Sequence, residues 1–428
     1  MGDREGKHRF VMSGDLGRPP RLAAGRHFSM LVRSMLLASA MGLGLLGAGT
    51  SHAVKPAQPG QAAEARLLDI YRLIGAGQGR LALKKAQSLV EDVPNFQLAQ
   101  MVYGDLLMAQ TAPLKAMGSA PADLTDRAPQ RIDQLRTEAE RRLSALRERP
   151  PADALPAQFI EIPPTTKHAI AVDASRSRLY LFENGPHGLR VVADHYVSIG
   201  RLGAEKAAQG DQRTPLGVYY ITSRLDGKQL TDFYGVGALP LNYPNEYDRR
   251  QGRTGSGIWL HGVPSDSYAR SPNSTDGCVA LANPELQTIL ERVQPRTTPV
   301  VIAKSLTWVP TKTAENERRN MRNLIEGWRV ARAGGDVTRL MSFYSAQFSN
   351  GNRDVNQWRQ LLEKEITHQH GRALQLKDLA ILGWRDKSDI LVVTFGEVTE
   401  GQRTGTIKRQ YWGKEGGLWK IFFEGVIG

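Results

Sequence analysis

Prolines divide this chain into segments of different hydrophobic periodicity, and this division constrains the fold more than any other feature. Five prolines fall between positions 150 and 164, where helical spacing ends and strand-like alternation begins. Proline lacks a backbone N–H and fixes φ, so it ends helices and is excluded from the interior of a sheet. A chain of 428 residues is long enough for two or three domains. We therefore predict a multidomain protein in which residues 152–165 form a linker.

The segment before these prolines has the three- and four-residue spacing of amphipathic helices. ARLLDIYRLI and FQLAQMVYGDLLMAQ repeat apolar residues at this spacing, and the charged stretch QRIDQLRTEAERRLSALRER ends at Pro150. We predict a small helical domain over residues 64–150. It is a candidate for internal packing or for a homodimer contact.

Residues 166–306 instead contain short runs that alternate with a period of two. RLYLF, VVADHYVSIG, GVYYI, GIWLHG and PVVIA read as strands, and PELQTILERV reads as a helix. This predicts a mostly-β domain.

The tail over residues 314–428 places helical patterns first and strands afterwards. The strands are SDILVVTFGEVTE, GTIKRQYWGKEG and LWKIFFEGVIG. This order predicts an α+β cone, and its layout resembles the nuclear-transport-factor-2-like (NTF2-like) fold. We expect the tail to bind rather than catalyse, so that its removal weakens action on an intact polymeric substrate more than on a small one.

Residues 1–53 read as an N-terminal extension and a signal peptide. Arg33 precedes the uncharged run Met35–Gly49, and SHA ending at Ala53 fits a cleavage site. The run is short for a membrane span, and an uncleaved anchor is the alternative, which would be the chain's only membrane contact. A cleaved signal peptide and an uncleaved anchor would both export the rest of the chain. We further hypothesise that translation starts at Met30, so that residues 1–29 are not made.

The formal net charge of +13 favours an anionic partner. The basic residues are scattered and no nucleic-acid-binding signature accompanies them, so we predict no nucleic-acid partner. The histidines do not combine with cysteine at zinc-site spacing, so we predict no metal.

Cys278 is the only cysteine, so it cannot form an internal disulfide. It is either a buried small hydrophobe or a functional thiol, and export favours function because a free thiol is a liability in an oxidising compartment. A cysteine nucleophile needs a base and an oxyanion hole. His261 lies seventeen positions upstream, and Gly277 allows a tight turn that aims backbone N–H groups at one point.

The pattern HG, followed by [ST]-x-G-C, with TPLG upstream, resembles the L,D-transpeptidase (YkuD-type) catalytic-domain family. His261-Gly262 and Thr275-Asp276-Gly277-Cys278 occupy the motif positions. Two positions depart from the family pattern, because Asp276 stands where most members have histidine and Ala280 where many have arginine. These departures, with LPLNYPNEYDRRQGRTGSGIWLHG, resemble the branch that contains L,D-carboxypeptidases and NTF2-like tails.

The resemblance implies a role for each motif residue. Cys278 is the nucleophile, and His261 is the general base and then the general acid. The Gly262 carbonyl orients His261, with Asp276 as a weaker candidate, and the N–H groups of Gly277 and Cys278 form the oxyanion hole. No cofactor is implied.

The resemblance also implies a periplasmic enzyme of cell-wall remodelling whose partners are peptidoglycan stem peptides. Such an enzyme attacks the diaminopimelate–D-Ala bond through an acyl-enzyme. An enzyme that transfers the acyl group to an amine is an L,D-transpeptidase, which is our first prediction. An enzyme that transfers it to water is an L,D-carboxypeptidase, which is our second. A non-catalytic peptidoglycan-binding scaffold is the alternative of another class.

We expect five residues to bind substrate: Thr275, Asp276, Tyr243, Asn245 and Arg253. Tyr234, Asn242 and Tyr247 lie in the same Gly- and Pro-bounded stretch, which is either a substrate groove or a polar surface loop. The candidates to replace the missing arginine at position 280 are Arg253, Arg270, Lys206 and Arg213.

Overall fold

The structure is a computed structural model, and it describes residues 59–114, 116–118, 129–369, 372–385 and 388–427. The predicted N-terminal extension and signal peptide lie outside these ranges. Within them, no helix combines the length and apolarity needed to cross a bilayer.

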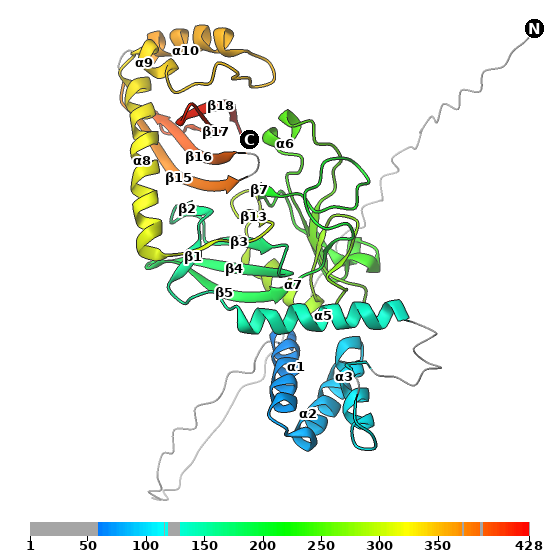
Figure 1. Cartoon of the computed structure of the whole chain (residues 1–428). Helices are drawn as coiled ribbons and strands as arrows, with labels where there is room; N and C mark the ends of the chain where they lie inside the picture. The colour runs from blue at the N-terminus through cyan, green and yellow to red at the C-terminus, as the bar shows by residue number, and fades with distance from the viewer. Residues whose placement is uncertain (1–58, 115, 119–128, 370–371, 386–387, 428) are drawn as a thin grey trace, which may run out of the picture. The chain divides into compact units, whose positions relative to one another are not determined.

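The first described region is helical, as the periodicity predicts. It contains α1 (Pro59–Gly75), α2 (Gly79–Asp92), α3 (Gln97–Met108) and α5 (Pro129–Arg147), shown in blue and cyan in Figure 1. Their apolar faces form one core, which also includes Tyr268 and Ala282 of the following domain. The helical region therefore packs against the domain that carries the predicted site.

The next domain is built on a five-stranded sheet with the order β5-β4-β3-β13-β7. Its strands are β3 (His168–Asp173), β4 (Arg178–Gly185), β5 (Gly188–Tyr196), β7 (Gly217–Tyr220) and β13 (Pro299–Ala303). The sheet is buried on both faces, since alternate residues of β3 contribute to two different cores. Ile170 and Val172 face the first core, and Ala169 and Ala171 face the second.

The first core is closed by a second sheet of short strands with the order β12-β10-β9-β8. These strands are β8 (Leu225–Asp226), β9 (Gly237–Pro240), β10 (Trp259–His261) and β12 (Val279–Ala280). A separate pair joins β6 (Ile199–Gly200) to β11 (Asn273–Thr275), and two helices, α6 (Glu246–Arg250) and α7 (Asn283–Arg292), complete the domain. The predicted motif residues thus lie on, or directly beside, β10, β11 and β12.

The C-terminal domain has the predicted order of helices and then strands. Its helices are α8 (Thr311–Ala333), α9 (Val337–Met341) and α10 (Val355–Gln369). The strands β15 (Leu374–Arg385), β16 (Asp389–Thr399), β17 (Thr406–Glu415) and β18 (Leu418–Val426) form an antiparallel sheet beside α8, as Figure 1 shows in orange and red. Trp328 and Trp412 are fully buried in the core between the helices and this sheet.

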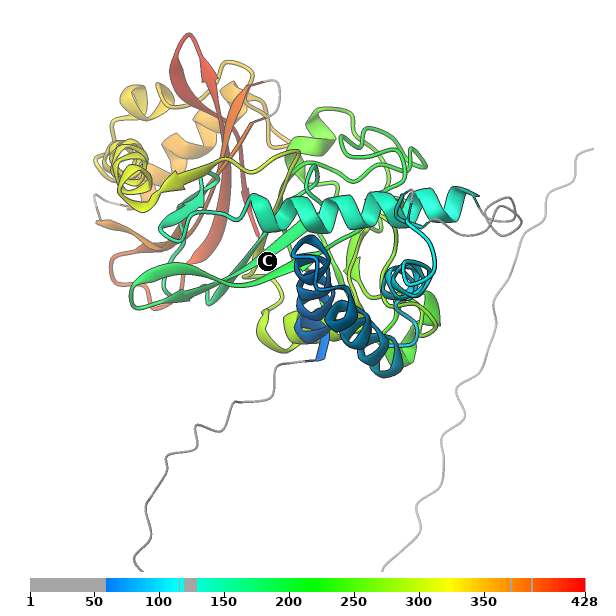
Figure 2. The same ribbon diagram turned by 60° about the horizontal axis from the view of Figure 1, so that its bottom comes forward.

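The prediction that residues 152–165 form a linker is wrong. β1 (Ala154–Pro156) pairs with β14 (Trp308–Pro310), and β2 (Phe159–Glu161) is the fifth strand of the C-terminal sheet, next to β15. All six residues of these two strands are buried. Each strand has only three residues, which is too short for a visible alternation, and the prolines flank them or lie at an edge. Figure 2 shows the same ribbon as Figure 1, turned about the horizontal axis.

Candidate active site

The pairing of β10 with β12 brings His261 and Cys278 to the same place. The two strands are parallel, with Leu260 opposite Val279 and His261 opposite Ala280. Cys278 immediately precedes β12, so it lies level with Trp259, whose side chain shares a strand face with His261. His261 and Cys278 both line one cavity of about 250 Å³.

The Cys278 sulfur lies against the backbone that leads into β10. The Trp259 N–H donates to Sγ at 3.4 Å, and the thiol donates to the Gly257 carbonyl at 3.4 Å. Burial raises the pKa of the Cys278 thiol, while the Trp259 N–H and the Arg270 charge oppose that rise. The resting sulfur is therefore a thiol at neutral pH.

His261 is buried and held by its neighbours. Its Nδ1 lies 2.6 Å from the Gly262 carbonyl oxygen, and the ring stacks on Phe233 at 5.9 Å and meets Tyr234 edge-on at 5.2 Å. Burial lowers the pKa of His261 to about 4, against the opposing effect of the Gly262 carbonyl. If Nδ1 carries the proton that it donates to this carbonyl, Nε2 is a free acceptor.

Gly262 must be a glycine because a side chain has no room there. A Cβ at this position would lie 2.1 Å from the Asn283 Oδ1. That oxygen accepts hydrogen bonds from the N–H groups of Val236 and Val263. Asn283 thereby ties the residue that follows Gly262 to the segment that contains Val236.

The turn before Cys278 is fixed by Thr275. Its hydroxyl donates to the Cys278 carbonyl at 2.7 Å and accepts from the Gly277 N–H at 3.2 Å. Gly277 has φ of +127°, which only glycine adopts readily. The Gly277 N–H, predicted for the oxyanion hole, is thus already bonded to Thr275, and the geometry places Thr275 as a support of the turn.

Two cations and one anion surround the thiol. Arg270 has its guanidinium 4.1 Å from the centre of the Phe233 ring. Burial lowers the pKa of this guanidinium, and the negative charge of a Cys278 thiolate or of Asp276 opposes that effect. Lys206 lines the cavity and is ion-paired with Asp211 at 2.7 Å. Asp276 also lines the cavity and lies 3.6 Å from the exposed Arg201.

The structure does not place three of the predicted substrate-binding residues at this cavity. Tyr243 is buried and donates to the Thr254 carbonyl at 3.0 Å. Asn245 caps α6, and its amide donates to the Val218 carbonyl at 3.1 Å. Arg253 pairs with the buried Asp248 at 3.0 Å. These polar side chains hold the loop together, which sequence alone does not distinguish from lining a groove.

Of the other residues considered for a substrate groove, some line the cavity and some do not. Tyr234 lines the cavity, whereas Asn242 accepts from the Tyr220 N–H and Tyr247 packs on Trp384 of the C-terminal domain. Arg213 donates to the Ala204 carbonyl at 3.0 Å. Of the four residues considered as replacements for the missing arginine, Lys206 lines the cavity and Arg270 does not. The Arg270 charge nevertheless lowers the pKa of Cys278 more than the Lys206 charge does.

Sequence reasoning did not single out several residues that line the cavity. They are Gln209, Gly210, Phe233, Gly255, Ser256, Gly257 and Ile258. The run GSG directly before the strand IWLH was a usable signal, because glycines let a backbone approach a reactive side chain closely. Within the described part of the chain, no group of three or more His, Cys, Asp or Glu side chains is placed to hold a metal.

Comparison with known families assigns two parts of the chain. Residues 167–302 match the family model of the L,D-transpeptidase catalytic domain, YkuD. The chain carries a YkuD-family catalytic domain. Residues 320–425 match the Cds6 C-terminal NTF2-like domain. The catalytic-domain family and the multidomain fold predicted from the sequence are confirmed.

Solved structures share parts of this architecture. The structure of Bdellovibrio bacteriovorus Bd1075 is 25% identical, with a TM-score of 0.56 over 64% of this chain and 98% of its own. The helical cell shape determining protein Pgp2 from Campylobacter jejuni is 21% identical, with a TM-score of 0.49 over 62% of this chain and 96% of its own. No curated protein matches the chain.

Proposed function

We propose that this protein is an exported, periplasmic L,D-transpeptidase that cleaves the diaminopimelate–D-Ala bond of peptidoglycan stem peptides through a Cys278 acyl-enzyme. The observation that carries the proposal is that Cys278 and His261 line one cavity within a YkuD-family domain. Peptidoglycan is the substrate class of that family, and the positive net charge suits an anionic cell wall.

The protonation states support general-base catalysis rather than a preformed thiolate–imidazolium pair. At neutral pH, His261 is neutral because burial lowers its pKa to about 4, and Cys278 is a thiol because burial raises its pKa. His261 therefore takes the proton as Sγ attacks the scissile carbonyl. It then gives that proton to the amine of the departing D-Ala, and the thioester remains on Cys278.

The oxyanion of the tetrahedral intermediate needs N–H donors beside Cys278. In the resting structure the Gly277 N–H is bonded to Thr275, so the Cys278 N–H is the better donor of the two that the motif implies. The Trp259 N–H, which donates to the resting thiol, is a second candidate. It lies 3.4 Å from the sulfur that forms the new bond.

L,D-Carboxypeptidase activity is the second candidate, and two residues favour it. Ala280 replaces the arginine that many family members carry, and Asp276 lines the cavity where most have histidine. An acidic side chain beside the thioester holds water, and the loss of an arginine weakens capture of a second stem. Hydrolysis of the acyl-enzyme then trims a tetrapeptide to a tripeptide.

Mass spectrometry of purified tetrapeptide muropeptides incubated with the protein tests the proposal. Dimers formed with release of D-Ala identify a transpeptidase, and tripeptides without dimers identify a carboxypeptidase. Cys278→Ala should form neither product, and its unfolding midpoint in urea should match that of the wild type. Unchanged muropeptides with a folded wild-type protein would overturn both activities and leave a binding scaffold.

A further inference from the structure

The loop between His261 and Cys278 is held by the helical region. The Asn95 amide donates to the Ser265 carbonyl at 3.1 Å, and the Asn95 carbonyl accepts from the Tyr268 N–H at 3.1 Å. The Phe96 and Tyr268 rings lie 4.2 Å apart. Farther along, Arg131 of α5 donates to the Ser271 hydroxyl at 3.2 Å. Residues 264–272, which include Arg270, thus have partners on the helical region at both ends.

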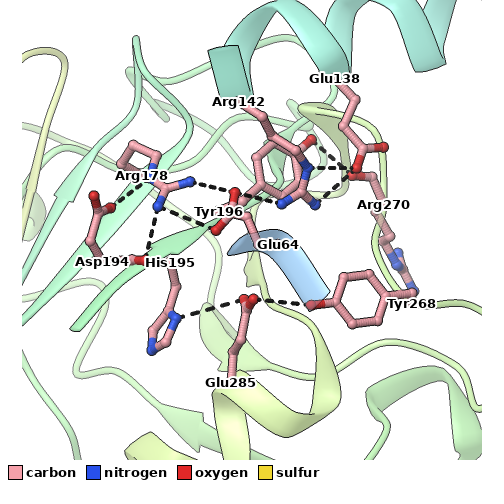
Figure 3. Close-up of polar contacts among 10 residues, drawn as sticks. All are labelled: Glu64, Glu138, Arg142, Arg178, Asp194, His195, Tyr196, Tyr268, Arg270 and Glu285. Carbon is pink, nitrogen blue, oxygen red and sulfur yellow. Dashed lines mark hydrogen bonds and ion pairs between the residues drawn. The ribbon is translucent and has the colours of Figure 1, made fainter. Parts of the chain in front are cut away.

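A buried ionic cluster forms a second connection between the helical region and the catalytic domain. Glu64 of α1 accepts from Arg142 of α5 at 2.7 Å and from Arg178 of β4 at 2.8 Å, and Figure 3 shows these side chains converging. Arg142 also bonds Glu138, and its guanidinium lies 3.9 Å from the centre of the Tyr196 ring. All of these groups are buried.

Tyr196 joins this cluster to the candidate active site. Its hydroxyl donates to the Arg270 backbone carbonyl at 2.9 Å. The Arg270 side chain then lies over Phe233, which stacks on His261. A continuous series of contacts therefore runs from Glu64 through Arg142 and Tyr196 to Arg270.

A buried ionic cluster is an inefficient way to stabilise a fold, because desolvation of the charges offsets most of their attraction. What it supplies is fixed geometry, since Arg142 can satisfy Glu64 and Glu138 together in few orientations. Here the fixed group is the guanidinium that lies on Tyr196. The cluster is therefore better suited to orient Tyr196 than to add stability.

We propose that the helical region positions Arg270 to bind the terminal D-Ala carboxylate of the stem peptide, and that Tyr196 is the positioning residue that carries this effect. This inference rests on the proposed function, because it names the group that recognises the substrate of the same site. Arg270 then supplies, from the loop, the cation that position 280 lacks. Among the described residues, no carboxylate lies within ion-pair distance of its guanidinium, which leaves its charge available to an anion.

Tyr196→Phe tests the connection with the smallest change, since it removes only the hydroxyl that reaches Arg270. Tyr219→Phe is the control: Tyr219 is also buried, and its hydroxyl also donates to a backbone carbonyl, that of Leu216 at 3.1 Å, with an Asp248 carboxylate oxygen at 3.5 Å. Tyr196→Phe should raise KM for tetrapeptide substrate ~3- to 10-fold, the equivalent of one hydrogen bond, with kcat within about 2-fold. Tyr219→Phe should change neither.

A substrate in which an amide replaces the terminal carboxylate distinguishes a loss of Arg270 positioning from a general loosening of the fold. With this substrate the wild type and Tyr196→Phe should have equal KM values, because Arg270 has no carboxylate to bind. In an Arg270→Ala background, Tyr196→Phe should have no further effect on the normal substrate. An equal rise in KM on both substrates, or with both tyrosine variants, would overturn the proposal.

Alkylation of Cys278 by iodoacetamide gives a readout that needs no turnover. Loss of the Arg270 charge should move the pH midpoint of alkylation upward, since that charge stabilises the thiolate. Tyr196→Phe should move it in the same direction by a smaller amount, and Tyr219→Phe should not. If these shifts occur while stem peptides remain uncleaved, the proposed function fails but the positioning of Arg270 stands; unshifted midpoints in an active enzyme refute the positioning.

Discussion

The pKa values of the two residues central to the candidate site are shifted by the same physical cause. Burial disfavours the charged form of each, so His261 stays neutral and Cys278 stays protonated at neutral pH. Neither shift is legible in the sequence, where a histidine and a cysteine at this spacing fit an ion pair equally well. The distinction decides how activity depends on pH.

We expect the acid limb of kcat/KM to have its midpoint near pH 4, so that activity is retained at pH 5. His261 must be neutral to act as a base, and its pKa of about 4 leaves it neutral above that pH. The measurement is a pH profile of D-Ala release from soluble muropeptides. An acid limb centred near 6.5 would show that the imidazole titrates as an ordinary histidine and would contradict the burial argument.

The identity of the acceptor should depend on positions 276 and 280. Asp276→His with Ala280→Arg restores the family pattern, removes an anion from the cavity and adds a cation. We expect the ratio of dimeric to trimmed products to rise ~3- to 10-fold, which corresponds to about 1 kcal/mol of changed partitioning. Arg201→Ala, which removes only the exposed partner of Asp276, is the control. An unchanged ratio would move the choice of acceptor to the cavity residues Phe233 and Tyr234.

At the scale of single elements, α7 carries a buried acid whose protonation affects stability. Burial, together with the Glu64 charge, raises the pKa of Glu285 from its ordinary value of 4.5 to about 8. Its nearest polar neighbours are the Tyr268 hydroxyl at 3.4 Å and His195 Nδ1 at 3.9 Å. Because the folded pKa is raised, the stability from the protonated form is complete below pH 4.5 and is lost as the pH rises through 8.

Glu285→Gln should therefore become more stable relative to the wild type as the pH rises from 6 to 9. Glutamine resembles the protonated acid and does not ionise, and the gain at pH 9 should be ~1–3 kcal/mol. Urea unfolding at each pH provides the free energies. Glu291→Gln, on the exposed face of the same helix, should show no such trend. A constant difference between Glu285→Gln and the wild type would exclude the raised pKa.

Elements were predictable from the sequence where their periodicity was long or their motif specific. Helices between residues 64 and 150 and the strands around His261 were expected, and so was the approach of a histidine-bearing strand to the cysteine turn. β15 was missed, although it has twelve residues, because a register shift after Lys377 breaks its alternation. The contacts of Tyr243, Asn245 and Arg253 were not foreseen, because their partners are backbone carbonyls or a buried carboxylate that no sequence pattern identifies.

At the scale of the whole molecule, the helical region also bears on association. Ile74, Leu81 and Leu107, which lie on α1, α2 and α3, are each more than two-fifths exposed. The homodimer contact expected there stays a prediction. Light scattering on the size-fractionated protein should give the mass of a dimer, and Leu81→Lys with Leu107→Lys should give that of a monomer. A monomeric wild type would leave these side chains as isolated surface residues.

The C-terminal domain is not an appended module, because it completes the second core of the catalytic sheet. Trp384 and Phe422 pack on Tyr247, with ring centres 4.9 and 5.9 Å apart, and the Arg409 guanidinium lies 3.9 Å from the centre of the Tyr220 ring. β2, from the N-terminal side of the catalytic domain, is a strand of the C-terminal sheet. This arrangement changes what removal of the tail should do.

Deletion of residues 312–428 should reduce activity on soluble muropeptides and on intact sacculi alike, since it uncovers the core face that includes Tyr220 and Tyr247. The sequence alone favoured a selective loss on sacculi. Because such a truncation could fail to fold, Trp384→Ala provides a milder test, with an expected loss of ~3–5 kcal/mol of unfolding free energy for a buried tryptophan. Leu418→Ser, at a highly exposed position of the same domain, should leave both stability and activity unchanged. A soluble truncation with full activity on muropeptides would show that the catalytic domain closes its core without the tail and would restore the view of a separable binding module.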